Sequence, residues 1–249
     1  MLRAALSVGL LILTSLFSFA NAEAIAKVAG LYGSPTASGR ALSVGSDIQE
    51  HDKIVVGSGN VQILFNDGTK LVLGSGSNLV IEKYLMKGGN TASNISIDAL
   101  RGTFRFITGN SAKNAYHIKT ANSTIGIRGT GFDFWVNNET GVAVLEGKVK
   151  LCRNGKCVDI NSGCQAGLAK ATDTQLLKPR PESLAIRSHL PFILDQSWLR
   201  PSFRLKVQSC AKILSLTESA EHSCHQSCST NCSKSTTGGP SCSTSCSCN

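Results

Sequence analysis

Short apolar runs, separated by glycine, asparagine and aspartate at close intervals, follow one another from Ile25 to about Ala171. Each run is about three to six residues long, which is the usual length of a β-strand. Asn66-Asp67-Gly68 and Asn154-Gly155 supply the positive backbone φ angles that tight hairpin turns require. No apolar stripe with helical periodicity interrupts this region. The pattern predicts an all-β domain over residues 23–171.

Strands of this length must share a core, because one alone buries too little apolar surface. They either stack as a compact two-sheet domain or coil into a short β-solenoid, and the sequence does not decide between these folds. In one run, Phe132, Phe134 and Val136 fall on one face, and Asp133 and Trp135 fall on the other. This alternation predicts an antiparallel sheet with one face in water.

Residues 1–22 have the three-part layout of a secretory signal peptide. Arg3 gives a positive start, an apolar run extends from Ala4 to Ala20, and Ala20-Asn21-Ala22 is a small-x-small cleavage pattern. Cleavage near Ala22 predicts a periplasmic or secreted protein. The alternative is an uncleaved anchor helix, although 17 apolar residues are at the short limit for spanning a bilayer. No later run is long enough, so no transmembrane segment is expected in the mature protein.

The formal net charge of +9 favours acidic partners such as anionic glycans, lipid headgroups or nucleic acid. Nucleic acid is not expected, because no dense basic run with interleaved aromatic residues is present. Basic residues outnumber acidic ones between residues 178 and 206. This stretch either forms an amphipathic surface for an anionic partner or a membrane, or packs on its own domain with its charges in water. The basic residues are Lys178, Arg180, Arg187, Arg200, Arg204 and Lys206.

The residue composition and pattern change after the β-region. Lys178-Pro179-Arg180-Pro181 is a stiff break, and short helices are predicted over residues 182–190 and 202–216. Residues 172–222 are therefore interpreted as a basic linker with short helices. Residues 223–249 form a tail rich in cysteine and serine that lacks large apolar residues. Such a tail is expected to be disordered unless it is cross-linked or bound to metal.

Ten cysteines behind a signal peptide indicate an oxidising compartment, where thiols pair. If Asn154-Gly155 is a two-residue turn, Cys152 and Cys157 face each other as a non-hydrogen-bonded pair with Cα atoms ~4.5 Å apart. This geometry predicts a disulfide, and the alternative is that Cys164 takes one of the two. Cys210 stands alone and is a candidate for covalent linkage to another protein.

The tail contains six further cysteines, which are Cys224, Cys228, Cys232, Cys242, Cys246 and Cys248. Outside the cytoplasm we expect them to form up to three disulfides. One alternative is thiolate binding of a soft metal with His222 and His225 nearby, although the C-x3-C spacing is not that of a zinc knuckle. Another is linkage to a partner protein or to the cell surface. No metal or other cofactor is assigned.

The chain has no evident catalytic site. Its five histidines lack the spacing of a metalloprotease, and no G-x-S-x-G nucleophile elbow is present. The glycines occur in strand turns, and none forms a phosphate-binding loop ahead of a helix. A non-enzymatic binding protein is therefore expected.

Two motifs of the β-region are distinctive, the block Ile125-Gly126-Ile127-Arg128-Gly129-Thr130-Gly131-Phe132 and the strand and turn Phe65-Asn66-Asp67-Gly68-Thr69. With the order of the motifs around them, they resemble the FecR domain over about residues 27 to 171, and the first block is the most specific. Further matches are Gly30 and residues 42–48, 52–57, 61–73, 101–106 and 144–149. The signature positions are Asp67, Gly68, Thr69, Gly126, Arg128, Gly129 and Thr130.

The resemblance implies an extracytoplasmic all-β module for protein interaction and envelope signalling. Family members named for iron uptake pass a signal to a sigma factor and carry a cytoplasmic segment and a membrane helix ahead of the domain. Only two or three residues precede the apolar run here, so the sigma-regulating activity is not carried over. We expect a stand-alone binding module in the bacterial envelope, with an envelope protein or an anionic glycan as partner. The alternatives are a structural or surface-attached protein cross-linked through its tail, and a metal-binding protein that uses the tail.

Arg128 is singled out because it stands between Gly126 and Gly129. Glycines in a strand let another backbone approach closely. In one interpretation Arg128 is buried and paired with a carboxylate such as Asp47, Asp67 or Asp133, which stabilises the fold. In the other it contacts a ligand. The first is the expectation from the sequence.

Overall fold

The structure, a computed structural model, describes residues 23–177, 185–186, 188–211, 228–235 and 238–246. The predicted signal peptide, the cleavage near Ala22, Cys224, Cys248 and the two tail histidines lie outside the described residues. Within the described ranges, no helix is long and apolar enough to cross a membrane.

The predicted all-β fold is confirmed. A single hydrogen-bonded sheet joins fifteen strands in the described part of the chain. In chain order the strands are β1 (Ala24–Gly33), β2 (Thr36–Ala37), β3 (Arg40–Ala41), β4 (Asp47–Gln49), β5 (Lys53–Val55), β6 (Gly59–Phe65), β7 (Lys70–Leu73), β8 (Asn78–Gly88), β9 (Thr91–Ile107), β10 (Tyr116–Thr120), β11 (Thr124–Val136), β12 (Thr140–Arg153), β13 (Lys156–Asn161), β14 (Gln165–Ala169) and β15 (Thr174–Leu176).

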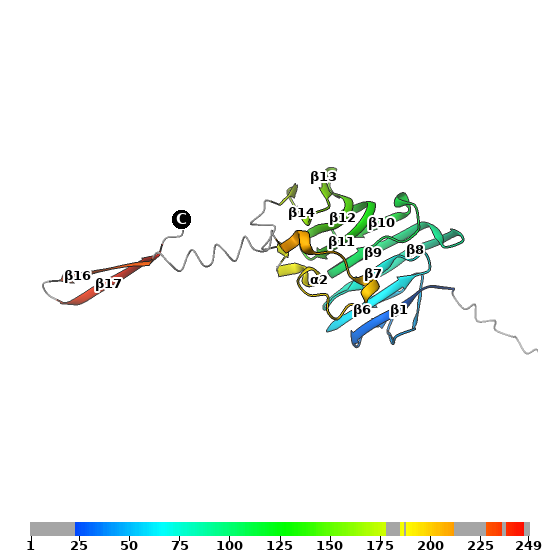
Figure 1. The fold of residues 1–249 in the computed structure, drawn as a ribbon, viewed down its shortest axis with the longest axis horizontal. Coiled ribbons are helices and arrows are strands. Elements are labelled where there is room, and N and C mark those ends of the chain that lie inside the picture. Colours follow the sequence, from blue (N-terminus) through cyan, green and yellow to red (C-terminus); the bar gives the residue numbers. More distant parts are fainter. Residues whose placement is uncertain (1–22, 178–184, 187, 212–227, 236–237, 247–249) are drawn as a thin grey trace, which may run out of the picture.

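This sheet folds into two layers, because β9, β11 and β12 each contribute one half to each layer. In the first layer they continue the order β4-β1-β6-β7 and end at β14 and β15, as Figure 1 shows for β1, β6, β7, β9 and β11. In the second layer they join β8, β10 and β13, and β10 runs parallel to β9. The structure therefore has two stacked layers connected by shared strands.

A glycine with positive φ lies on each shared strand where it passes between layers. These are Gly102 on β9, Gly129 on β11 and Gly147 on β12, with φ values of 116°, 85° and 77°. Gly129 falls within a break in the β11–β12 register between Ile127 and Thr130. Glycine adopts such angles without a Cβ penalty, and bulges bend strands sharply. Each residue belongs to a motif block that resembles the FecR domain, so these blocks mark the corners of the fold.

The main core lies between the two layers and draws residues from both, including Leu71 and Phe104 from the first and Ile118 and Leu151 from the second. Aromatic rings stack across β9 and β11, where the ring centroids of Phe104 and Phe134 are 4.8 Å apart. The alternation predicted for β11 places its phenylalanines in this core, as expected.

The other face of the first layer is not in water, and here the prediction was wrong. Asp133 and Trp135 are 0% and 2% exposed. Residues 188–211, here called the strap, cover this face with α2 (Pro191–Leu194) and the 3-10 helix η2 (Pro201–Phe203) (Figure 1). A period of two shows which residues share a face, but it does not show what covers that face. For the described part of the basic stretch, which contains Arg200, Arg204 and Lys206, the structure agrees with packing on the domain. Lys178, Arg180 and Arg187 lie outside the described residues.

Two tail segments, β16 (Cys228–Ser235) and β17 (Gly238–Cys246), pair as an antiparallel hairpin. Composition alone predicts disorder for this tail unless it is cross-linked or bound to metal. The register places Cys228 opposite Cys246 and Cys232 opposite Cys242. The bonding of these cysteines remains a prediction.

Candidate functional site

A groove of about 810 Å³ opens where the first sheet layer meets the strap. Its sheet side is formed by the end of β1, the start of β6 and the turn after β7, and its strap side by Pro191, Phe192 and Trp198. Tyr32 and Trp198 line the groove and are 74% and 39% exposed. Large aromatic side chains left in solvent beside a concave surface are typical of a binding site.

Glycine and serine residues shape the sheet side of the groove. The Ser75 hydroxyl accepts a hydrogen bond from Gly59 N at 3.0 Å and donates one to Gly59 O at 3.0 Å. A Cβ on Gly74 would lie 3.2 Å from Phe192 Cζ, so the absent side chain makes room for the Phe192 ring. The strap can therefore approach the sheet closely at Gly74.

The Trp198 loop is held in place by its neighbours in the strap. Ser197 N donates a hydrogen bond of 2.8 Å to Asp195 Oδ1, and this bond lowers the pKa of Asp195. The Arg204 guanidinium donates to Leu199 O at 2.9 Å and to Ser197 O at 2.8 Å. The Trp198 ring meets the Phe192 ring edge-on at a centroid distance of 5.4 Å. Trp198 is therefore presented by an ordered loop.

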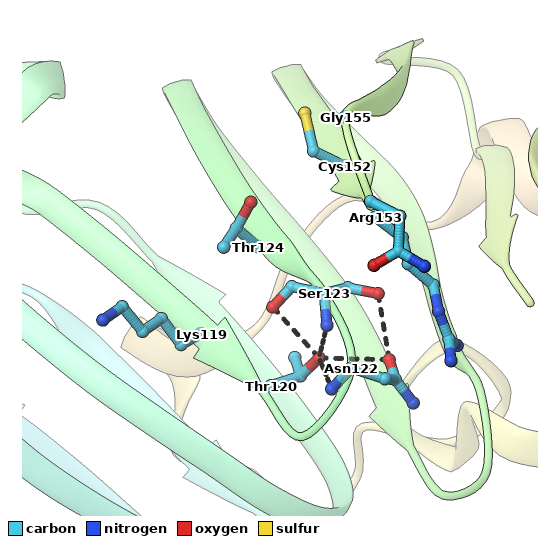
Figure 2. Close-up of a pocket in the computed structure, with 9 residues that line it drawn as sticks. Lys119, Thr120, Asn122, Ser123, Thr124, Cys152, Arg153 and Gly155 are labelled. Carbon is cyan, nitrogen blue, oxygen red and sulfur yellow. Dashed lines mark hydrogen bonds between the residues drawn. The ribbon is translucent and has the colours of Figure 1, made fainter. Parts of the chain in front are cut away.

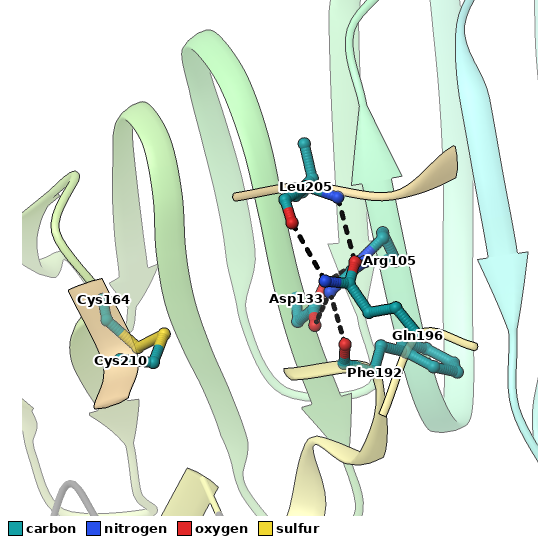
Figure 3. Close-up of a disulfide and its surroundings, with 7 residues drawn as sticks. All are labelled: Arg105, Asp133, Cys164, Phe192, Gln196, Leu205 and Cys210. Atoms are coloured by element: carbon teal, nitrogen blue, oxygen red, sulfur yellow. Dashed lines mark hydrogen bonds and ion pairs between the residues drawn. A yellow bond between two sulfur atoms is a disulfide. The ribbon is translucent and has the colours of Figure 1, made fainter. Parts of the chain in front are cut away.

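A buried ion pair fastens the strap to the sheet. Arg105 of β9 donates to Asp133 of β11 from Nε at 2.7 Å and from Nη2 at 2.8 Å, and both side chains are 0% exposed. The same guanidinium donates to Phe192 O at 3.0 Å and to Gln196 Oε1, as Figure 3 shows. Gln196 in turn bridges to the backbone of Leu205. Arg105 therefore connects the sheet to Phe192 and Gln196 of the strap, and through Gln196 to Leu205.

The electrostatics of this pair follow from its burial. Burial raises the pKa of Asp133, and the Arg105 guanidinium offsets part of that rise. A buried charge is tolerated when a partner and hydrogen bonds compensate its lost hydration. The strap carbonyls satisfy guanidinium donors that Asp133 leaves unused.

Two disulfides lie in the described part of the chain. Cys152 and Cys157 are bonded across the Asn154–Gly155 turn with Cα atoms 4.1 Å apart, as the hairpin geometry predicts. Cys164 is bonded to Cys210 instead, with a Cα separation of 5.1 Å, at the end of the strap (Figure 3). The expectation that Cys210 lacks a partner was wrong, and a covalent link to another protein through Cys210 is not available in this state.

The signature residue Asp67 has a structural role. Its carboxylate is fully buried and accepts hydrogen bonds from Thr69 N at 3.0 Å, Ser111 Oγ at 2.6 Å and Tyr116 OH at 3.1 Å. Tyr84 OH lies 3.4 Å from Oδ1 and accepts from Asp67 N at 2.9 Å. Gly68 has a φ of 85° and completes the turn. The motif therefore joins the β6–β7 turn to β8 and β10 through a carboxylate surrounded by hydroxyl groups.

Arg128 does not have the role expected from the sequence. Its side chain is exposed on the second layer, whereas Asp133 pairs with Arg105, Asp47 pairs with Lys27, and Asp67 is held by hydroxyl groups. The structural interpretation of Arg128 was therefore wrong. Gly126 is also exposed, Gly129 lies at the corner already described, and Thr130 pairs with Gly147 in the backbone register.

Among the residues that the structure describes, no group of three or more His, Cys, Asp or Glu side chains is placed to hold a metal ion. The metal-binding alternative concerns the tail and stays a prediction, as does the surface-attachment alternative.

Sequence reasoning missed the aromatic groove. Tyr32 and Trp198 are 166 positions apart in the chain, and only the strap brings them to one cavity. No short-range pattern signals this contact. The one sequence signal is a pair of aromatic residues outside any apolar run, and this is too weak to locate a site.

Residues 52–150 match the family model of the FecR protein.

The match confirms the resemblance seen in the motifs. It extends from β5 to near the end of β12 and includes Asp67, Arg105 and Asp133. The strap and β1 lie outside the FecR match, so Tyr32 and Trp198 belong to parts of the groove that the family model does not cover.

Two crystal structures of a candidate anti-sigma factor from Parabacteroides distasonis ATCC 8503 are similar to this chain. Their sequence identities are 16% and 17%, and their TM-scores are 0.41 and 0.39. Each similarity covers 50% of this chain and 57% of the other, so the match spans little more than half of that protein's length. No curated protein matches the chain.

Proposed function

We propose that this chain is an exported, non-catalytic binding protein of the bacterial envelope, and that its groove receives an extended apolar segment of another envelope protein. The observation that carries this proposal is the exposure of Tyr32 and Trp198, 74% and 39%, on a groove of about 810 Å³. Tyrosine and tryptophan dominate the binding energy of protein interfaces because they bury much apolar area with few rotatable bonds.

The lining of the groove favours a protein segment over an anionic glycan. Leu31, Phe192 and the two exposed aromatic residues line it together with glycine, serine, threonine, asparagine and proline, and no charged side chain belongs to the described lining. An anionic glycan requires cationic partners that this surface does not provide. An apolar peptide side chain gains from burial against the same surface.

The position at a sheet edge favours an extended segment. Pairing between β1 and β4 ends at Lys27, and within the described residues no strand continues it beside Leu31–Gly33. Peptides commonly add to such an edge through main-chain hydrogen bonds, while adjacent pockets take alternate side chains. The groove would supply the pocket, and the end of β1 would supply the edge.

Export and signalling are supported by independent features. Two disulfides occur in the described part of the chain, and disulfides persist in oxidising compartments. The FecR match supports a signalling-related role in the envelope and a regulatory rather than catalytic protein. In this proposal, binding of a protein segment in the groove is the event that starts the signal.

A photoreactive amino acid placed in the groove tests the proposal. Introduced in place of Tyr32 and activated in living cells, it should give a cross-linked product with an envelope protein. The matched control is the same amino acid in place of Leu85, which is 42% exposed on β8 away from the groove. Trp198→Ala should abolish the product formed at position 32. Identical products from positions 32 and 85, or no product at position 32, would overturn the proposal.

A further inference from the structure

Cations gather at the end of the molecule where the β12–β13 turn lies. Lys119 is the second-last residue of β10, Arg153 and Lys156 flank the turn, and Lys170 follows β14. We call these four residues the basic end. Asp173 shares a cavity with three of them, Arg153, Lys156 and Lys170. None of the four cations takes part in an ion pair within the part of the chain that the structure describes.

Two adjoining cavities open on the basic end. One, of about 360 Å³, is lined by Lys119, Asn122 and Arg153 among others. The second, of about 190 Å³, is lined by Arg153, Lys156 and Lys170. Arg153 lines both cavities and is therefore the cation that they share.

Each of the two cavities is lined by a residue with an unsatisfied buried polar atom. Arg153 Nη1 is buried and has no hydrogen-bond partner within the described residues, and Thr174 Oγ1, in the smaller cavity, is in the same state. Thr174 is 8% exposed. Buried polar atoms without partners are uncommon because each costs free energy of desolvation. A bound anion would supply the acceptor that Arg153 Nη1 lacks.

Asn122 adds a neutral donor whose orientation is fixed. Its Oδ1 accepts hydrogen bonds from Thr140 Oγ1 at 2.6 Å and from Ser123 Oγ at 2.9 Å, so Nδ2 carries the free donors. Figure 2 shows the Arg153 side chain extending toward Asn122 from the neighbouring strand. The Asn122 amide, in the turn between β10 and β11, and Arg153, at the end of β12, therefore line the same cavity.

The turn that carries Arg153 is rigid. The Cys152–Cys157 disulfide closes it, and Arg153 and Lys156 face each other in the β12–β13 register. A cation held on a cross-linked hairpin loses little conformational freedom when it binds a ligand.

We propose that the larger cavity of the basic end binds a phosphate group. The Arg153 guanidinium and the Asn122 amide at one cavity, which Lys119 also lines, match the several acceptor oxygens and the negative charge of phosphate. The source is either free phosphate or the headgroup of an anionic lipid. This site is separate from the aromatic groove and does not depend on the function proposed for it.

Titration of the oxidised protein with inorganic phosphate, followed by amide NMR shifts, tests the proposal against sodium chloride at equal ionic strength. Shifts at Asn122, Arg153 and the adjacent turn should saturate with phosphate and not with chloride. Arg153→Gln should weaken the apparent affinity about tenfold, as expected for a lost charge-assisted hydrogen bond. Arg128→Gln removes the same charge from an exposed site on the same layer and should change the affinity less than about twofold.

Asn122→Asp is a second variant, chosen because it should fold normally and still lose phosphate binding. It keeps the Oδ1 acceptor for Thr140 and Ser123, removes the Nδ2 donors and places a negative charge beside Arg153. Phosphate binding should be lost while the thermal melt stays at or above that of the wild type. Retained phosphate binding in Asn122→Asp would overturn the proposal.

Vesicles distinguish the two sources. Co-sedimentation with phosphatidylglycerol vesicles but not with phosphatidylcholine vesicles, lost in Arg153→Gln, assigns the site to a lipid headgroup. Saturable binding of inorganic phosphate without vesicle binding assigns it to free phosphate. If phosphate shifts match those of chloride and neither vesicle binds, the basic end is a solvated surface and the proposal fails.

Discussion

Arg105 and Asp133 occupy opposite positions on neighbouring strands and form two hydrogen bonds of 2.7 and 2.8 Å, with neither side chain exposed to solvent. The pair lies on the sheet face opposite the main core, under the strap. Because Arg105 also donates to Phe192 O and Gln196 Oε1, one guanidinium stabilises both the β9–β11 pairing and the docking of the strap that carries Trp198.

Replacement of Arg105 by Met should destabilise the protein by about 3–5 kcal/mol, because it leaves the Asp133 carboxylate buried without a partner. Urea unfolding measures the loss. Arg101→Gln, an exposed arginine on the same strand, should change stability by less than about 0.5 kcal/mol. The double variant Arg105→Met/Asp133→Leu should recover most of the loss, and a double variant no more stable than Arg105→Met would contradict the account.

The disulfide Cys164–Cys210 should stabilise the fold more than Cys152–Cys157. The sequence separations are 46 and 5, and closure of the longer loop restricts the unfolded chain more, by about 4 kcal/mol against about 2 kcal/mol. Cys164→Ala/Cys210→Ala should lower the melting temperature further than Cys152→Ala/Cys157→Ala, and should expose the strap to limited proteolysis. Equal melting temperatures for the two variants would show that the strap docks without its disulfide.

Stability should fall at alkaline pH through two tyrosines. Burial raises the pKa of Tyr84 and Tyr116 above the ordinary value of about 10, and the Asp67 carboxylate adds to the rise in both. Since the folded protein keeps protons that the unfolded chain releases, this contribution is complete below about pH 10 and is lost as the pH rises further.

Denaturant unfolding between pH 9 and 11.5 checks this expectation. The slope of unfolding free energy against pH should be smaller in Tyr84→Phe/Tyr116→Phe than in the wild type. Tyr32→Phe alters the one remaining tyrosine of the chain, which is 74% exposed, and should keep the wild-type slope. Equal slopes in all three proteins would refute a role for the buried phenols.

Local patterns predicted the parts of the fold that local chemistry determines. The Asn154-Gly155 turn predicted the Cys152–Cys157 disulfide, because the residues that set the register are adjacent in sequence. The alternation of Phe132 and Phe134 likewise predicted the face that meets the core. Both inferences need only backbone geometry over a few residues.

Contacts between distant segments were not predictable in this way. Asp133 was expected in water because its face of β11 looks polar, yet Phe192 and Gln196, some sixty positions later, cover the Arg105 that pairs with it. Arg128 was expected to be buried because glycines surround it. Instead, Gly129 allows β11 to bend between the two layers, and the buried arginine that pairs with Asp133 is Arg105. Sequence shows that a residue is unusual locally and does not show which segment will pack on it.

Gly141 offers a test of how the strap depends on the sheet beneath it. Gly141 faces Trp135 across the β11–β12 register, and a Cβ there would lie 1.9 Å from the indole ring. Trp135 cannot move aside freely, because it is 2% exposed and stacks on His189 of the strap at 4.9 Å. Gly141→Ala should therefore cost about 1–3 kcal/mol through overpacking and should displace the strap.

Thermal melts and strap proteolysis measure this effect, and Gly126→Ala is the matched control. On β11 a Cβ at Gly126 would meet no atom closer than 3.7 Å, so alanine should be tolerated there. Trp135→Leu combined with Gly141→Ala removes the clashing ring and should restore part of the lost strap protection. If Gly141→Ala and Gly126→Ala have the same melting temperature, a Cβ at position 141 does not clash with the Trp135 ring. The docking of the strap would then be independent of this strand pair.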